Sequence, residues 1–144
     1  MMSKSDDKIF IASDAAFNEV THKAGLAAIL LSSDGLPVYI LGKDVQAEDN
    51  TKAELLAILF ALDEIPNEEQ EVVVQTDSLN AYNTLQESAK LNVPWLIEVA
   101  KQIKAKVAEK KLSVTYKWVP REENESADAV SKLAVRHGDI WARR

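Results

Sequence analysis

Four acidic side chains lie at positions where the neighbouring residues are apolar or small. Asp14 and Asp77 each follow a short apolar run, so each comes directly after an expected strand. Glu54 shares one helical face with alanine and isoleucine side chains, and Asp128 lies between two alanines. If these carboxylates converge, they repel one another and raise one another's pKa values. Hard divalent cations such as Mg²⁺, which prefer carboxylate oxygen, relieve that repulsion, so the pattern indicates a divalent-cation site.

Each of the four also has a purely local explanation. Asp14 can open a turn, and Asp77 can cap the helix that follows it. Glu54 suits the positive end of a helix dipole, and so does Asp128, which also has Lys132 four residues further on as an ion-pair partner. Residue types alone leave both interpretations open at every position.

The composition excludes several other kinds of chemistry. The 144 residues contain no cysteine, so disulfides, thiolate metal sites and cysteine nucleophiles are absent, and the histidines are His22 and His137 alone. No apolar run approaches the roughly 20 residues that cross a bilayer, and the polar start of the chain does not resemble a secretory signal. We therefore expect one domain, no membrane partner and a cytoplasmic location.

Charge is unevenly distributed along the chain. Residues 1–72 carry 5 basic and 14 acidic side chains, a net of −9, whereas residues 73–144 carry 12 basic and 9 acidic ones, a net of +3. The overall net charge of −6 disfavours nucleic acid as a partner, but a basic half weakens that objection.

The periodicity predicts the elements that must position these side chains. Strands are expected at 9–12, 25–31, 37–41, 71–75 and 112–119. Helices are expected at 52–64, 95–110 and 124–136. A further helix is expected to be capped by residues 76–78 and to end at about residue 86. This order predicts an α/β fold with a five-stranded mixed sheet, an antiparallel meander plus parallel strands, flanked by helices. If the fourth strand lies beside the first, Asp14 and Asp77 share the crevice at their carboxyl ends. Residues 1–7 are expected to fray, 8–136 to form the domain and 137–144 to be a tail.

Four segments carry a resemblance to a known family. Residues 11–17 (Ile-Ala-Ser-Asp-Ala-Ala-Phe), 50–55 (Asn-Thr-Lys-Ala-Glu-Leu), 75–78 (Gln-Thr-Asp-Ser) and 119–128, which ends in Glu-Ser-Ala-Asp, are similar to the motifs of type 1 ribonuclease H, in the same order. The resemblance covers residues 8–136. It implies a catalytic, metal-holding quartet of Asp14, Glu54, Asp77 and Asp128.

The resemblance also implies an activity. The expected enzyme is a monomeric endoribonuclease that hydrolyses the RNA strand of RNA/DNA hybrids with two Mg²⁺ ions, for which Mn²⁺ can substitute. One ion would activate the attacking water and the other would stabilise the leaving 3′ oxygen. The substrate contacts that the resemblance and the basic residues suggest are Ala15, Ala16, Asn50, Thr51, Ser78, Arg121, Lys101 and Lys104, with Lys111 on the same helical face.

The sequence departs from the family at several of these places. Ala15 and Ala16 stand where glycine and serine are usual, and Leu79 stands where many members have glutamine. The loop histidine of many bacterial members is missing, with Arg121 nearby, and there is no basic handle. Two other functions stay open: a DNA nuclease of the resolvase or integrase kind, and a non-catalytic nucleic-acid-binding module. Lys101, Lys104 and Lys111 can also form a helix face that only contacts solvent.

Overall fold

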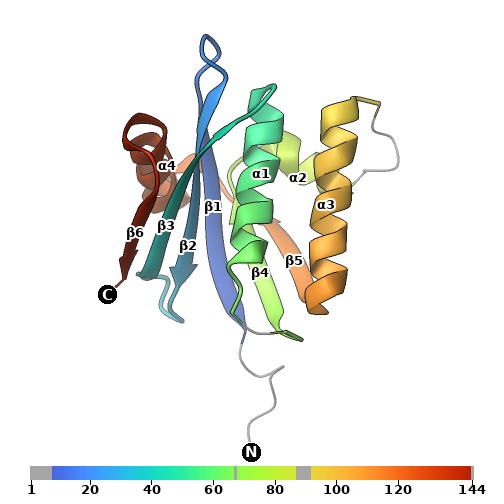
Figure 1. Ribbon diagram of the computed structural model, residues 1–144. Helices are drawn as coiled ribbons and strands as arrows, with labels where there is room; N and C mark the ends of the chain where they lie inside the picture. The colour runs from blue at the N-terminus through green and yellow to red at the C-terminus, as the bar shows by residue number, and fades with distance from the viewer. Residues whose placement is uncertain (1–7, 67, 87–91, 144) are drawn as a thin grey trace, which may run out of the picture.

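The fold is a twisted mixed sheet with helices on both faces (Figure 1). A computed structural model describes residues 8–66, 68–86 and 92–143. Its elements, in chain order, are β1 (Ile9–Phe17), β2 (Lys23–Leu31), β3 (Pro37–Gln46), α1 (Asn50–Asp63), β4 (Glu71–Thr76), α2 (Leu79–Gln86), α3 (Pro94–Lys110), β5 (Ser113–Trp118), a short 3₁₀ turn (Arg121–Glu123), α4 (Glu125–His137) and β6 (Ile140–Arg143). The expected frayed segment 1–7 lies outside the described residues.

The strands follow the order β5-β4-β1-β2-β3-β6 across the sheet. β1, β2 and β3 form the antiparallel meander, and β4 and β5 run parallel to β1. β4 pairs directly with β1 from Ile9↔Val72 to Ala12↔Gln75, so the predicted neighbourhood of these two strands is confirmed. Their carboxyl ends therefore lie at the same edge of the sheet.

The sheet has six strands, and the prediction of five is wrong. The sixth strand, β6, comes from the segment expected to be a tail, and it pairs antiparallel with β3 from Tyr39↔Arg143 to Gly42↔Ile140. Four residues are too few for a periodic pattern, and the partner strand lies about a hundred positions earlier in the chain. Only the folded molecule brings the two together.

The core lies between the sheet and the helices on each face. α1 and α3 pack side by side over one face, around large buried side chains such as Leu55, Ile58 and Ile103. α4 covers the other face through Ala127 and Val130. In the described part of the chain, no helix is long and apolar enough to cross a membrane.

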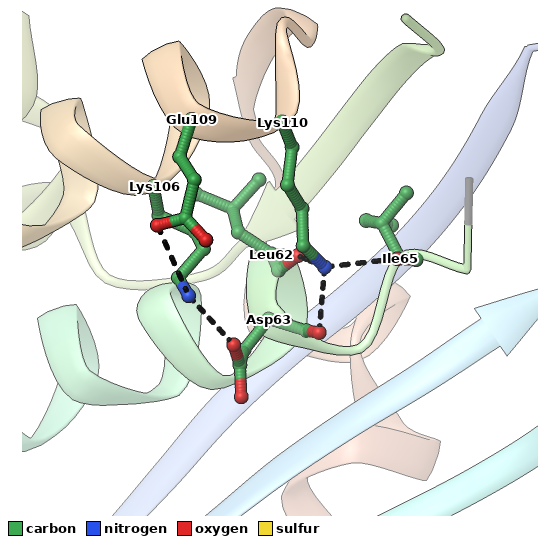
Figure 2. A network of polar contacts seen from close by, with 6 residues as sticks. All are labelled: Leu62, Asp63, Ile65, Lys106, Glu109 and Lys110. Atoms are coloured by element: carbon green, nitrogen blue, oxygen red, sulfur yellow. Dashed lines mark hydrogen bonds and ion pairs between the residues drawn. The ribbon is translucent and has the colours of Figure 1, made fainter. Parts of the chain in front are cut away.

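A lysine holds the C-terminal end of α1 against α3 (Figure 2). The Lys110 Nζ donates to the carbonyl oxygens of Leu62, Asp63 and Ile65, at 3.1, 2.7 and 2.9 Å. These carbonyls lie at and just beyond the end of α1, where main-chain acceptors lack helical partners. Lys106 adds an ion pair with the Asp63 carboxylate at 3.0 Å.

The opposite end of α1 is held by Asp49. Its carboxylate accepts a hydrogen bond from the Lys52 N–H at 2.7 Å, which is N-cap geometry. The Trp95 indole Nε1, at the start of α3, donates to the other oxygen of Asp49 at 2.8 Å. Since both ends of α1 are anchored, the position of Glu54 within it is well defined.

Gly25 of β2 permits α4 to lie directly on the sheet. A Cβ at this position would stand 2.1 Å from the Ser131 carbonyl oxygen and 2.4 Å from the Val135 backbone nitrogen. Both are backbone atoms of α4, which cannot move aside as a flexible side chain would. The distance between β2 and α4 depends on the absence of a side chain at Gly25. The position of Asp128, which α4 carries, depends on it as well.

We therefore expect Gly25→Ala to lower the free energy of unfolding by about 3 kcal/mol or more, at the upper end of the cost of overpacking. Gly42→Ala is the matched control, because its Cβ would meet only side chains, the nearest at 3.1 Å. Urea unfolding of the two variants and the wild type measures the difference. A Gly25→Ala protein as stable as Gly42→Ala would contradict this account of the packing.

Candidate active site

Asp14 lies at the point where β1 loses its neighbour on one side. β1 continues to pair with β2 beyond Asp14, but its pairing with β4 ends at Ala12↔Gln75. The Asp14 side chain is buried, and its Oδ1 accepts a hydrogen bond from the Ala15 N–H at 2.9 Å. Asp14 therefore lies within β1 and not after it as expected, and its buried carboxylate lies where β1 and β4 separate.

Glu54 projects from the buried side of α1. Only 7% of the residue is exposed, although glutamate rarely lies inside a protein unless it is paired. Its Oε1 has no hydrogen-bond partner in the described part of the chain. Burying a carboxylate oxygen without a partner costs free energy. A bound cation would supply the missing partner of this atom.

Asp77 follows β4, and its side chain does not cap the next helix. The Ser78 hydroxyl accepts from the Ala81 N–H at 3.1 Å and so caps α2, while the Thr76 hydroxyl accepts from the Ser78 N–H at 3.1 Å. The Trp118 indole Nε1 donates to the Asp77 carbonyl oxygen at 3.1 Å. The helix-cap interpretation of Asp77 is therefore wrong, and its carboxylate is available to the cluster.

Carboxylate oxygens of Asp14, Glu54 and Asp77 all lie within 4.8 Å of one another. Burial and the charge of Asp77 raise the pKa of Asp14 from its usual 3.8 to about 7. Burial and the charges of Asp14 and Asp77 raise the pKa of Glu54 well above its ordinary value. Burial also raises the pKa of Asp77, although the positive charge of Arg121 opposes that rise.

Asp128 approaches this trio from α4 but is not within the same 4.8 Å set. Its carboxylate pairs with Lys132 at 3.0 Å, so the local ion pair expected from the sequence is present. Its negative charge nevertheless contributes to the raised pKa values of both Asp14 and Asp77. Asp128 therefore lies close enough to act electrostatically on the cluster.

Asn124, which the sequence predicts only as the start of a helix, connects several elements of the site by hydrogen bonds. Its buried side-chain amide donates to the Ser13 carbonyl oxygen at 2.9 Å, and its amide oxygen accepts from Gln75 Nε2 at 3.1 Å. A hydrogen bond from this amide also lowers the pKa of Asp77. One residue thus joins β1, β4 and the start of α4. The polar residue just before the last helix was the available signal.

The donor set fits a hard divalent cation. All the clustered ligand atoms are carboxylate oxygens, the type that Mg²⁺ and Mn²⁺ accept, and neither thiol nor imidazole is among them. One Glu54 oxygen has no partner among the described residues, and the pKa values of all three carboxyls are raised, so the positive charge of Arg121 compensates the cluster only in part. The three residues can therefore hold a metal ion.

The expected substrate contacts fall into two groups. Ala16, Asn50, Thr51, Ser78 and Arg121 lie at the carboxylate edge of the sheet or at the start of α1, and Asn50 and Arg121 are exposed. Ala15, by contrast, packs in the core, and its N–H donates to Asp14 Oδ1.

The lysines expected to contact substrate lie away from the cluster. Lys101 and Lys104 are exposed on α3, and Lys111 precedes β5 at its amino end. β4 and β5 are parallel, with Glu71↔Ser113 at one end and Thr76↔Trp118 at the other. At about 3.3 Å per residue, Lys111 is therefore separated from the Asp77 end of the sheet by roughly the full strand length, about 17 Å.

Comparison with known proteins agrees with this architecture. The family model described as reverse transcriptase-like matches residues 12–134, and the chain belongs to that family. It is an RNase H-like protein, as the sequence motifs predicted. Among curated proteins it is 26% identical over 141 residues to the uncharacterized protein YpeP of Bacillus subtilis (strain 168), a match that covers 94% of this chain and 62% of that one. The chain thus spans less than two thirds of that relative's length.

Solved structures of ribonucleases share the fold. RNase H1 from Halobacterium salinarum superposes with a TM-score of 0.75 at 24% identity, covering 90% of this chain and 98% of that one. The N-terminal RNase H domain of a Mycobacterium tuberculosis protein gives 0.76 at 22% identity, with 90% and 94% covered. LC11-RNase H1 in complex with RNA/DNA hybrid gives 0.75 at 23% identity, with 89% and 96% covered.

The raised pKa values predict how the stability of the metal-free protein depends on pH. Asp14 has a pKa near 7 when folded and 3.8 when unfolded, so between these values the folded state binds more protons and stability falls as pH rises. We expect the free energy of unfolding in EDTA to decrease from pH 5 to pH 8 by about 2–4 kcal/mol, at about 1.4 kcal/mol per pKa unit.

Urea unfolding across this pH range measures the effect. The control is Asp14→Asn, which removes the titrating group and should flatten the profile. The same fall in both proteins would show that Asp14 is not its cause.

Proposed function

We propose that this protein is an endoribonuclease that hydrolyses the RNA strand of RNA/DNA hybrids. The observation that carries the proposal is the convergence of Asp14, Glu54 and Asp77 at the carboxyl end of two parallel strands, with Asp14 and Glu54 buried and one Glu54 oxygen without a partner among the described residues. The RNase H fold supports it, and one structure with that fold holds an RNA/DNA hybrid. We also propose that the enzyme works as a monomer in the cytoplasm.

Each carboxylate has a role in this proposal. Asp14, Glu54 and Asp77 would hold a divalent cation, and Asp128, beside them on α4, would help to hold a second. When bound, Mg²⁺ or Mn²⁺ supplies a nucleophilic water and stabilises the leaving 3′ oxygen. The burial of Asp14 and Glu54 keeps bulk water from screening their charges.

The remaining polar groups position the substrate. Arg121 is near enough to lower the pKa of Asp77, and its guanidinium is a donor for a phosphate oxygen at the same place. Asn50 and Thr51 begin the helix that carries Glu54, and Ser78 adjoins Asp77. We propose that these groups face the minor groove of the hybrid, where 2′-hydroxyls distinguish RNA from DNA.

We expect the protein to cleave labelled RNA/DNA hybrid in Mg²⁺ and to leave 5′-phosphate and 3′-hydroxyl ends. The reason is that the cluster offers carboxylates and no histidine or cysteine nucleophile. EDTA should stop the reaction, and Mn²⁺ should restore it. Duplex DNA of the same sequence is the control. Equal cleavage of both duplexes would point to a DNA nuclease, and binding of hybrid without cleavage in either metal would point to a non-catalytic module.

Asp77→Asn should separate catalysis from stability. It removes one charge from the cluster, so we expect cleavage to fall by at least about a hundredfold, while the metal-free protein stays as stable or gains about 1 kcal/mol. Mg²⁺ should raise the melting temperature of the wild type more than that of the variant, by linkage.

Thermal unfolding of both proteins with and without Mg²⁺, beside the cleavage assay, tests this. Asp139→Asn, at an exposed position before β6, is the matched control and should cleave normally. A variant at Asp77 that cleaves at the wild-type rate would remove that residue from the site.

A further inference from the structure

Gln75, on β4 just before the carboxylate cluster, has no part in the proposed chemistry. Val72 and Val74 of the same strand point into the core beneath α1 and α3, so the alternation of side chains turns Gln75 to the opposite face of the sheet. There its amide nitrogen donates to the carbonyl oxygen of Glu123 at 3.0 Å and to the amide oxygen of Asn124 at 3.1 Å. One side-chain amide thus holds the two consecutive residues just before α4.

The direction of these hydrogen bonds is fixed at both ends of the network. The Glu123 carbonyl oxygen can only accept, so the NH2 group of Gln75 must face it. The Ser13 carbonyl oxygen can likewise only accept, so the NH2 group of Asn124 must face it. Because Gln75 also donates to the Asn124 amide oxygen, it directs the NH2 group of that amide toward β1 and toward Asp77, with which the amide also forms a hydrogen bond.

Asn124 lies where β1 and β4 separate. Main-chain pairing of the two strands ends at Ala12, and the Asn124 amide contacts the next residue, Ser13. Asn124 is 2% exposed, so an amide turned the other way would leave buried polar groups unpaired. Since Asp14 follows Ser13 directly, the separation of the Asp14 and Asp77 carboxylates depends on the orientation of this amide.

We propose that Gln75 is a positioning residue that sets the affinity of the cluster for a divalent cation, because it orients the amide of Asn124. This inference rests on the part of the proposed function that places a cation at the cluster. Residues that orient metal ligands without touching the metal change affinity or activity by about 10–100-fold when they are replaced. At a fixed Mg²⁺ concentration, replacement of Gln75 should lower kcat and leave KM for the hybrid unchanged.

Two replacements separate positioning from a simple effect of charge. Gln75→Met keeps the length of the side chain but removes both donated hydrogen bonds, so we expect Mn²⁺ binding to weaken by about tenfold. Gln75→Glu keeps the shape but, when ionised, can only accept, so the Asn124 NH2 group must turn from β1 toward it. We expect Gln75→Glu to weaken Mn²⁺ binding more than Gln75→Met does, although an added negative charge by itself would strengthen it.

Mn²⁺ affinity is measured at pH 8, without nucleic acid, from the electron paramagnetic resonance of the free ion. Circular dichroism and urea unfolding confirm that each variant is folded under these conditions. The matched control, Gln102→Met, makes the same change at an exposed position of α3 outside the network, and it should bind Mn²⁺ like the wild type.

A double-variant cycle determines whether Gln75 acts through Asn124. In the Asn124→Ala background, Gln75→Met should cause little further loss of Mn²⁺ affinity, because the amide that Gln75 orients is gone. If Asn124→Ala does not fold, the sign of the change in Gln75→Glu decides between positioning and charge.

Three results would overturn the proposal: wild-type Mn²⁺ affinity in Gln75→Met, tighter binding in Gln75→Glu, or full additivity in the cycle. The outcome is separable from that of the proposed function. A chain in which Gln75→Met weakens Mn²⁺ binding, but which never cleaves hybrid, keeps the positioning residue and loses the nuclease. A chain that cleaves hybrid, and in which Gln75→Met binds Mn²⁺ normally, does the reverse.

Discussion

The rest of this structure depends on the repulsion among three carboxyl groups held within 4.8 Å of one another in a buried place. Asp14, Glu54 and Asp77 come from β1, α1 and the end of β4, so the three elements must stay together although their charges oppose it. The cost appears in the raised pKa values and in a Glu54 oxygen without a partner among the described residues. Packing and hydrogen bonds elsewhere must exceed that cost.

The neighbouring elements offset this repulsion at identifiable points. Asn124 links β1 and β4 on one side of the cluster, and the Trp118 indole holds the main chain at Asp77. α1 is fixed at one end by Asp49 with Trp95 and at the other by Lys110. These contacts to the main chain and to the helix ends do not use the carboxylate oxygens of the trio, which, when ionised, can accept a cation.

The two halves of the chain contribute charges of opposite sign to the site. The acidic first half of the chain contributes Asp14 and Glu54, whereas the basic second half contributes Arg121, whose positive charge acts on Asp77. Net charge alone therefore says little about whether this chain binds nucleic acid, because the sign of the field varies over its surface.

The class of fold, the order of the elements from β1 to α4 and the three clustered carboxylates could be predicted from the amino-acid sequence, because apolar periodicity and motif spacing are local and can be read along the chain. The sequence also predicted that β1 and β4 adjoin, and that Asp14 and Asp77 share an edge. It could not predict that Ser78 and not Asp77 caps α2, that Asn124 joins three elements, or that 140–143 adds a sixth strand. The Ser78 cap is a local contact, but Asp77 does not compete for it because its carboxylate lies in the cluster with Asp14 and Glu54. The other two outcomes depend on contacts between residues far apart in the chain, which only tertiary packing brings together.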